Sequence, residues 1–402
     1  MVQFSQSVKF FRSSAVRDLM SVAIKPDVIS FAGGMPGNEL FPVSEMEELY
    51  AQLPLAEKQM AFQYGPTPGY PPLLDSLTDY LRRKGFPVDK NKLLITTGSL
   101  QAIYILTKIF IDPGNIIVTE NPSFVGALSA FSSFQAALHS IPLRSDGIDC
   151  AMLESYLKSD EAQNVKFIYL TPNFHNPAGI LYSRENRRKV AEIAGRFGVP
   201  VIEDDAYGEL YFEKEMKELV TPLKVLYEDT CTICTVGSFS KIVGPGFRLG
   251  WMLVPPEIYK QAELCKQSID ACSPNFTQVL ADAFLRSGKM EVYIEKLREI
   301  YRKRKNSMVA AIKRYFPEEV GWNDPQGGFY IWCSVPSSVN VIEVLQKCME
   351  QGAIYVIGQT FDPDAKDTTH FRLSFSNTPE EKIEEGIRIL GNVLKQSLKM
   401  EK

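Results

Sequence analysis

Seven short segments rich in Val, Ile and Thr recur between residues 93 and 254, and they predict strands. They cover residues 93–98, 115–120, 136–141, 165–171, 200–204, 231–237 and 248–254. Most are continuous apolar runs, as expected of strands covered on both faces. Longer segments with helical spacing lie between them, such as 99–111 and 184–198. This alternation predicts an α/β fold, with a mainly parallel seven-stranded sheet flanked by helices.

The pattern changes after Pro274, where a charged helical stretch over 289–316 is followed by shorter strand and helix segments. We therefore expect an N-terminal arm over 1–30 and a large domain over 31–288. A smaller α/β domain would cover 289–402 and take in part of the N-terminal segment.

Composition and charge narrow the function. The chain has 402 residues, with 44 Lys and Arg against 48 Asp and Glu, a net charge of −4. That mild acidity argues against nucleic-acid binding, which needs a basic surface. No apolar run approaches the length of about 18 residues that spans a membrane, and the N-terminus lacks a signal core. Seven scattered cysteines fit reduced thiols, so we expect a cytoplasmic protein.

A polar tetrapeptide, Ser238-Phe239-Ser240-Lys241, directly follows the strand predicted over 231–237, and Arg248 comes seven residues after its lysine. Ligands bind at such strand ends in open α/β sheets. Hydroxyls and a guanidinium suit a phosphate, and an amine suits a Schiff base with an aldehyde. A solvated polar loop is the alternative.

The acidic run Glu203-Asp204-Asp205-Ala206-Tyr207 closes another predicted strand. A carboxylate there could hold a pyridinium N–H, and a phenol three residues after it could reach a ring oxygen. A solvated turn is the alternative. A metal site is disfavoured because the three histidines show no ligand spacing with these acids.

Two further turns follow predicted strands. The segment 173–179, NFHNPAG, comes after 165–171, and an ordinary loop explains it equally well. We interpret its His175 as structural rather than as a general base. The segment 96–102, TTGSLQA, opens a helix whose free N–H groups could cradle phosphate, although Ser99 could be a simple N-cap.

A pair of cysteines, Cys231 and Cys234, has the spacing of zinc and redox motifs. Both fall on one predicted strand, where positions i and i+3 face opposite sides. We therefore expect them to pack in the core, and we predict no metal site.

The polar pieces, in this order and spacing, resemble fold type I pyridoxal-phosphate enzymes of the class I/II aminotransferase family. The likeness covers nearly the whole chain and is closest to the 2-aminoadipate/kynurenine aminotransferase branch. The segments that carry it are SFAGGMPGNELFP, FQYGPTPGYPPL, TTGSLQA, ENPSF, TPNFHNPAG, EDDAYGELYF, GSFSKIVGPGFRLGW and FRLSFS. The resemblance implies pyridoxal 5'-phosphate as the cofactor and a homodimer with shared sites.

The same resemblance assigns the chemical roles. Lys241 would form the Schiff base with the cofactor and, once released, move a proton between the substrate Cα and the cofactor. Asp204 would keep the pyridinium nitrogen protonated. Tyr207 and Asn176 would hydrogen-bond the 3-oxygen of the ring.

The cofactor phosphate and ring contacts follow from the resemblance as well. The implied phosphate ligands are the backbone of Ser99 and Leu100, the Ser238 and Ser240 hydroxyls, Arg248, and Tyr64 from the neighbouring subunit. Phe124 would stack on the ring where many relatives have Tyr, and Leu100 replaces the usual Gln. Neither departure removes a catalytic group.

Substrate recognition is implied in turn. Arg372 would hold the α-carboxylate with Asn176, Gly34 would let the backbone approach it, and Arg17 would approach the substrate side chain. Family analogy also predicts that the Asn176–Pro177 peptide is cis.

The predicted function is transfer of an amino group from an L-amino acid of 2-aminoadipate, aromatic or branched-chain type to a 2-oxo acid. The acceptor would be 2-oxoglutarate, in a ping-pong mechanism. A lyase or decarboxylase on the same fold is one alternative. A ligand-sensing protein is another; such relatives carry a fused helix-turn-helix domain, for which the chain leaves no room.

Overall fold

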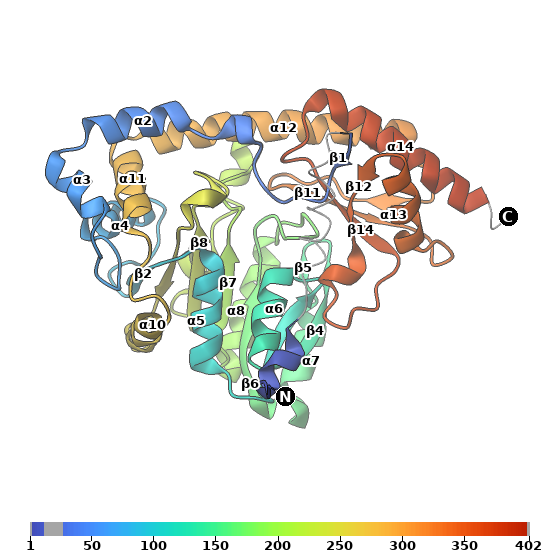
Figure 1. Cartoon of the computed structure of the whole chain (residues 1–402). Coiled ribbons are helices and arrows are strands. Elements are labelled where there is room, and N and C mark those ends of the chain that lie inside the picture. Colours follow the sequence, from blue (N-terminus) through green and yellow to red (C-terminus); the bar gives the residue numbers. More distant parts are fainter. Residues whose placement is uncertain (1, 12–26, 400–402) are drawn as a thin grey trace.

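The computed structural model describes residues 2–11 and 27–399. Its centre is an eight-stranded sheet in the order β2-β9-β8-β7-β6-β3-β4-β5 (Figure 1). The strands are β2 Lys92–Thr96, β3 Ile116–Asn121, β4 Ala137–Arg144, β5 Gly147–Ile148, β6 Val165–Leu170, β7 Val201–Asp205, β8 Ile233–Ser238 and β9 Gly250–Val254. All seven predicted strands are present, and β5 is a two-residue addition antiparallel to β4. The predicted α/β fold class is confirmed.

Strand direction gathers the polar strand ends at one edge. The strands β4, β3, β6, β7 and β8 pair in parallel, so their carboxyl ends meet there. Strand β9 runs antiparallel to both β8 and β2. Strand β8 is buried along its whole length, as expected of a strand covered on both faces. Strand β7 buries Val201 and Ile202 and, at its carboxyl end, the acidic Glu203 and Asp204.

Helices cover both faces of this sheet. One face packs on α5 Ser99–Phe110, α6 Val125–Ser133 and α10 Pro256–Ile269. The other packs on α7 Cys150–Leu157, α8 Arg184–Phe197 and α9 Leu223–Tyr227. Cys234 belongs to the first core and Cys231 packs against the second. The expectation that these two cysteines pack on opposite faces of the strand is confirmed.

The C-terminal part forms a smaller α/β layer. Its antiparallel sheet has the order β10-β11-β14-β13, with β10 Gly321–Trp322, β11 Tyr330–Ser334, β14 His370–Ser374 and β13 Val356–Ile357. The helices are α13 Val341–Glu350, α14 Glu380–Lys399 and the long α12 Lys289–Tyr315. Helix α12 runs along the top of the molecule in Figure 1, from α11 to α14, and so links the two layers.

The N-terminal residues reach both layers. The 3-10 turn η1 Gln6–Phe10 lies against α6, whereas β1 Ile29–Ser30 pairs in parallel with β12 Ala353–Ile354 of the C-terminal layer. A helical group beside the large sheet comprises α2 Val43–Gln52, α3 Leu55–Ala61, α4 Pro71–Arg83 and α11 Asn275–Arg286. The remaining 3-10 turns are η2 Asn38–Leu40, η3 Asp160–Asn164, η4 Lys214–Lys217, η5 Pro245–Phe247 and η6 Gly358–Phe361. The division at residues 30 and 288 stays a prediction.

Within residues 2–11 and 27–399, no helix is both long enough and apolar enough to cross a membrane.

Candidate active site

A cavity of about 330 Å³ opens where the carboxyl ends of the parallel strands meet the C-terminal layer. Twelve of the residues predicted for the site line it: Gly34, Ser99, Leu100, Phe124, Asn176, Asp204, Tyr207, Ser238, Ser240, Lys241, Arg248 and Arg372. They come from segments spread over more than 300 residues, so the fold brings together what the sequence holds apart. We call this space the site cavity.

Lys241 provides the one primary amine among the residues that line the site cavity. It lies three residues beyond the end of β8, and its Nζ donates a hydrogen bond of 2.7 Å to the Gly34 carbonyl. Burial, reinforced by the cations of Arg372 and Arg248, lowers the pKa of Lys241 to about 8; the Asp204 carboxylate opposes this. An amine with that pKa is neutral in a large fraction of molecules near pH 8, so it can act as a nucleophile or base.

Asp204 offers a carboxylate oxygen without a partner. Its Oδ2 accepts a 2.7 Å hydrogen bond from the Tyr169 hydroxyl, whereas its buried Oδ1 has no partner among the described residues. Burial raises the pKa of Asp204 to about 6, with the Tyr169 hydrogen bond opposing the rise. A buried unpaired oxygen is costly unless a ligand donates to it. A ligand with a protonated ring nitrogen supplies the missing donor.

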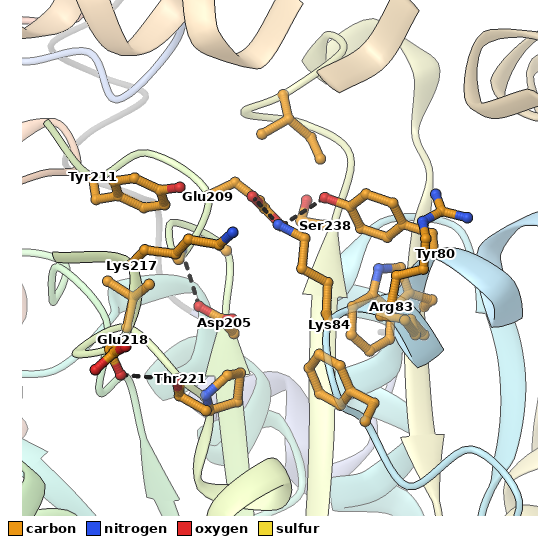
Figure 2. A pocket seen from close by; sticks show the side chains of 18 residues that line it. Tyr80, Arg83, Lys84, Asp205, Glu209, Tyr211, Lys217, Glu218, Thr221 and Ser238 are labelled. Atoms are coloured by element: carbon orange, nitrogen blue, oxygen red, sulfur yellow. Dashed lines mark hydrogen bonds and ion pairs between the residues drawn. The ribbon is translucent and has the colours of Figure 1, made fainter. Parts of the chain in front are cut away.

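Asp205 faces elsewhere, because successive residues of a strand point to opposite sides. Its Oδ1 accepts hydrogen bonds of 3.0 Å each from Asn173 Nδ2 and from the Gly208 N–H. Its side chain lines a second cavity (Figure 2). The structure thus places Asp204 in the site cavity and Asp205 outside it.

The start of α5 forms an anion cradle with Arg248. No side chain in the described part of the chain caps this helix, and Gly98 before it has a φ of 79° that favours glycine. A Cβ on Gly98 would lie 2.6 Å from Arg248 Nη2, so the guanidinium sits directly against the turn. The hydroxyls of Ser238 and Ser240 line the same cavity. Free amides at a helix start, a guanidinium and hydroxyls together suit a phosphate group.

Arg372 comes from β14 and is 2% exposed. Its Nη1 donates to Asn176 Oδ1 at 2.8 Å and its Nη2 to the Ala32 carbonyl at 2.6 Å. Its buried Nε has no partner among the described residues. The guanidinium is held in place and keeps an unused donor, as binding of a carboxylate requires. The Asn176–Pro177 peptide is cis, as predicted.

Comparison with known proteins identifies the family. Residues 27–390 match the sequence model of the family described as aminotransferase class I and II. The chain belongs to the class I and II aminotransferases. It is 35% identical over 401 residues to aromatic-amino-acid aminotransferase 1 of Thermococcus litoralis, covering 98% of this chain and 95% of the relative.

Two solved structures show the same architecture. The kynurenine aminotransferase of Pyrococcus horikoshii, in complex with PMP, KYN and KYA, has a TM-score of 0.93 and 34% identity, covering 98% of this chain and 97% of that one. LysN, the alpha-aminoadipate aminotransferase of Thermus thermophilus complexed with N-(5'-phosphopyridoxyl)-L-leucine, has a TM-score of 0.88 and 31% identity, with coverage of 99% and 98%. The predicted family is confirmed: the chain is an aminotransferase acting on amino acids and 2-oxo acids.

One described residue predicted for this aminotransferase site is not among those that line the site cavity. Tyr64 is 83% exposed and does not line it. Arg17 lies outside the described residues. No cluster of metal-binding side chains occurs in the parts of the chain that the structure describes.

The aminotransferase site contains residues that sequence reasoning missed. Tyr330, on β11, has its hydroxyl 2.9 Å from that of Tyr207. Tyr169, on β6, supports Asp204. Both lie within apolar strand runs, where a tyrosine carries no visible functional signal. His175, interpreted as structural, does not line the cavity; its Nε2 lies 3.2 Å from the buried Glu120 Oε2.

A second cavity of about 470 Å³ adjoins the site cavity, and Ala206 and Ser238 line both. Figure 2 shows Tyr80 and Lys84 directed at Glu209, with hydrogen bonds of 2.6 and 2.9 Å. Lys84 and Glu209 on its walls form an ion pair, and other acidic and basic side chains also line it. The cavity therefore shows no preference for one class of ligand.

Proposed function

We propose that the residues of the site cavity carry out transfer of an amino group from an L-amino acid to a 2-oxo acid, with 2-oxoglutarate as the acceptor. Pyridoxal 5'-phosphate is the cofactor of this aminotransferase. The observation that carries the proposal is the placement of the Lys241 amine in one cavity with the unpaired Asp204 oxygen and the unpaired Arg372 N–H. An amine, an anion and a carboxylate receptor are the three groups the reaction needs.

The donor set fits the cofactor. Asp204 Oδ1 would accept from the ring nitrogen, and the cradle of α5 and Arg248 would hold the phosphate. Tyr207 and Asn176 would contact the 3-oxygen, and Phe124 would cover the ring face. When bound, pyridoxal phosphate supplies a ring that withdraws electrons from the amino acid Cα.

Lys241 would move the proton. With its pKa lowered to about 8, its Nζ can accept a proton from the substrate Cα and return it to the aldehyde-derived carbon of the cofactor. The hydrogen bond to the Gly34 carbonyl fixes the direction of the amine. Arg372 and Asn176 would orient the α-carboxylate of donor and acceptor in turn, which limits the bonds of Cα to one productive arrangement.

The donor class follows the relatives, whose printed names include aromatic-amino-acid and alpha-aminoadipate aminotransferases. We propose donors of the 2-aminoadipate, aromatic or branched-chain type. A role for Arg17 in admitting an acidic side chain remains part of this proposal.

The deciding experiment records the absorbance of the purified protein before and after L-glutamate, beside a Lys241→Ala variant. We expect a cofactor band in the wild type that glutamate shifts to shorter wavelength, and no such response in the variant. A panel of donors with 2-oxoglutarate then identifies the new amino acid formed. Release of ammonia in place of a new amino acid would contradict transfer and indicate a lyase.

We further propose that the enzyme is a homodimer. Tyr64 and Phe62, two residues apart, are 83% and 78% exposed, and the ring centroid of Phe62 lies 5.7 Å from that of Phe276, which is 38% exposed. Leu55, 71% exposed, adds to this surface. Exposed apolar patches of this kind mark interaction sites, and a second copy of the chain would bring Tyr64 to the partner's phosphate cradle.

Subunit hybrids test this arrangement. We expect Tyr64→Ala and Lys241→Ala chains, each weakly active alone, to recover activity when mixed, because a mixed dimer holds one complete site. Random pairing of equal amounts gives about a quarter of the wild-type activity. The single variants refolded separately serve as controls. Failure to recover would show that Tyr64 serves its own subunit or no site at all.

A cytoplasmic location is also proposed. All seven cysteines are free thiols, and Cys234, Cys333 and Cys348 are buried. Unpaired thiols are typical of a reducing compartment. Cell fractionation with an antibody to the native chain tests this location.

A further inference from the structure

We infer that Tyr330 is a positioning residue whose hydroxyl donates to Tyr207 and so turns the Tyr207 proton toward the 3-oxygen of the cofactor ring. The inference rests on the proposed function, because it needs the cofactor in the site cavity. It assigns a role to a phenol on β11, which is distant in sequence from the site residues that follow the parallel strands.

The two phenols form an isolated pair. Their oxygens lie 2.9 Å apart, Tyr207 is 4% exposed and Tyr330 1% exposed, and both line the site cavity. Within residues 2–11 and 27–399, the mutual contact is the one hydrogen bond found for either hydroxyl. Each phenol has one proton. One proton makes the shared bond, and the other is left for a ligand.

The surroundings decide which oxygen keeps the free proton. A Cβ on Gly34 would overlap the Tyr330 hydroxyl, so this oxygen is pressed against the Gly34 backbone, with little room for a ligand atom. If Tyr207 donated the shared hydrogen bond, the proton of Tyr330 would point into this confined space, where no ligand atom could accept it. Tyr330 therefore donates, and Tyr207 directs its own proton into the cavity.

The hydrogen bond from Tyr207 to the 3-oxygen is stronger when Tyr207 also accepts one from Tyr330, because each bond polarises the next. The Tyr330 bond ends on the Tyr207 oxygen and the Tyr207 bond on the 3-oxygen, so together they disperse the negative charge of the 3-oxygen. That charge also helps to hold the proton on the nitrogen that joins Lys241 to the cofactor. Without Tyr330, the oxygen keeps more charge and the proton is held to a higher pH.

The test is a pH titration of the cofactor absorbance band in Tyr330→Phe, which keeps the ring and removes the oxygen. We expect its midpoint to rise by about half a pH unit. Tyr301→Phe is the matched control, since Tyr301 is fully buried, its hydroxyl has no hydrogen-bond partner among the described residues, and it does not line the cavity. Its midpoint should equal that of the wild type.

A double variant separates action through Tyr207 from any other effect. In a Tyr207→Phe background, adding Tyr330→Phe should leave the midpoint unchanged. A further shift in that background, or equal midpoints for Tyr330→Phe and wild type, would overturn the inference alone. Absence of the band in the wild type after loading with pyridoxal phosphate would overturn the proposed function, and the inference with it.

Discussion

Gly34→Ala is the substitution whose consequence the structure defines best. The backbone of Gly34 accepts the hydrogen bond from Lys241, and an added Cβ would overlap the Tyr330 hydroxyl. The φ of Gly34 is not positive, so alanine meets no backbone penalty there. The loss of stability in Gly34→Ala therefore comes from the contact with Tyr330. A second substitution, at Tyr330, should remove that loss.

The size of the effect follows from the contacts. After the hydroxyl, the nearest atoms to the added Cβ are Tyr330 Cζ at 3.1 Å and Cε1 at 3.4 Å. With the oxygen present, the phenol must retreat by more than about 1 Å to reach van der Waals contact. The Tyr330 ring is enclosed on three sides. Its centroid lies 4.3 Å from the Arg372 guanidinium carbon and 5.7 and 6.2 Å from the ring centroids of Tyr207 and Phe329. Overpacking of such a site costs about 1–3 kcal/mol.

The assay is a double-mutant cycle in chemical denaturation, read from the midpoint in urea at constant slope. We expect Gly34→Ala to be destabilising in the wild type and nearly neutral in Tyr330→Phe, where only the 3.1 Å contact remains tight. The coupling free energy should be about 1–2 kcal/mol. If Gly34→Ala lowered the free energy of unfolding by the same amount, within about 0.5 kcal/mol, in the wild type and in Tyr330→Phe, the reasoning would be refuted.

Three further predictions concern the site cavity. Asp204→Asn should lower kcat by about 10²–10³-fold, since a developing charge loses its partner, whereas Asp205→Asn should stay within about threefold; steady-state kinetics compare the two, and equal losses would contradict the assignment. Arg372→Lys should lower kcat/KM by about 30- to 150-fold for donor and acceptor alike, as expected for loss of a bidentate contact; an effect on one substrate only would show a second carboxylate receptor. Cofactor-free protein should develop the cofactor band at a rate that rises with pH through a midpoint of about 8, not the 10.5 of an ordinary lysine, because burial disfavours the charged Lys241. Because the pKa of Lys241 is lower in the folded state than in the unfolded state, the free energy of unfolding should rise between pH 8 and 10.5. In that range the folded protein has lost the Lys241 proton and the unfolded chain still holds it.

The sheet could be predicted because buried parallel strands are continuous apolar runs. The edge strand β5 could not be predicted, because it has two residues and so short a strand carries no pattern. The last strand was predicted from residue 248 but begins at Gly250. Arg248 has a left-handed φ of 49°, which places it in the turn before the strand.

The site residues that the residue pattern alone marked stand at strand ends, where polar side chains interrupt apolar runs. Asp204 and Lys241 are of this kind. Tyr330 and Tyr169 are not, because each lies within an apolar run and gains its role from a partner distant in sequence. The Tyr207–Tyr330 bond joins residues 123 apart, and no local pattern encodes that meeting.

The pocket for the α-carboxylate joins two stretches of chain that a ribosome makes far apart in time. Ala32 and Arg372 are hydrogen bonded across 340 residues, and β1 finds its partner only in Ala353–Ile354. Synthesis at about 5–20 residues per second takes roughly 20–70 s to cover that distance. When residue 254 has been synthesised, the partners of strands β2 to β9 all exist, whereas β1 still lacks its partner β12. The α-carboxylate pocket can therefore form only after Arg372 has been synthesised, late in translation of the chain.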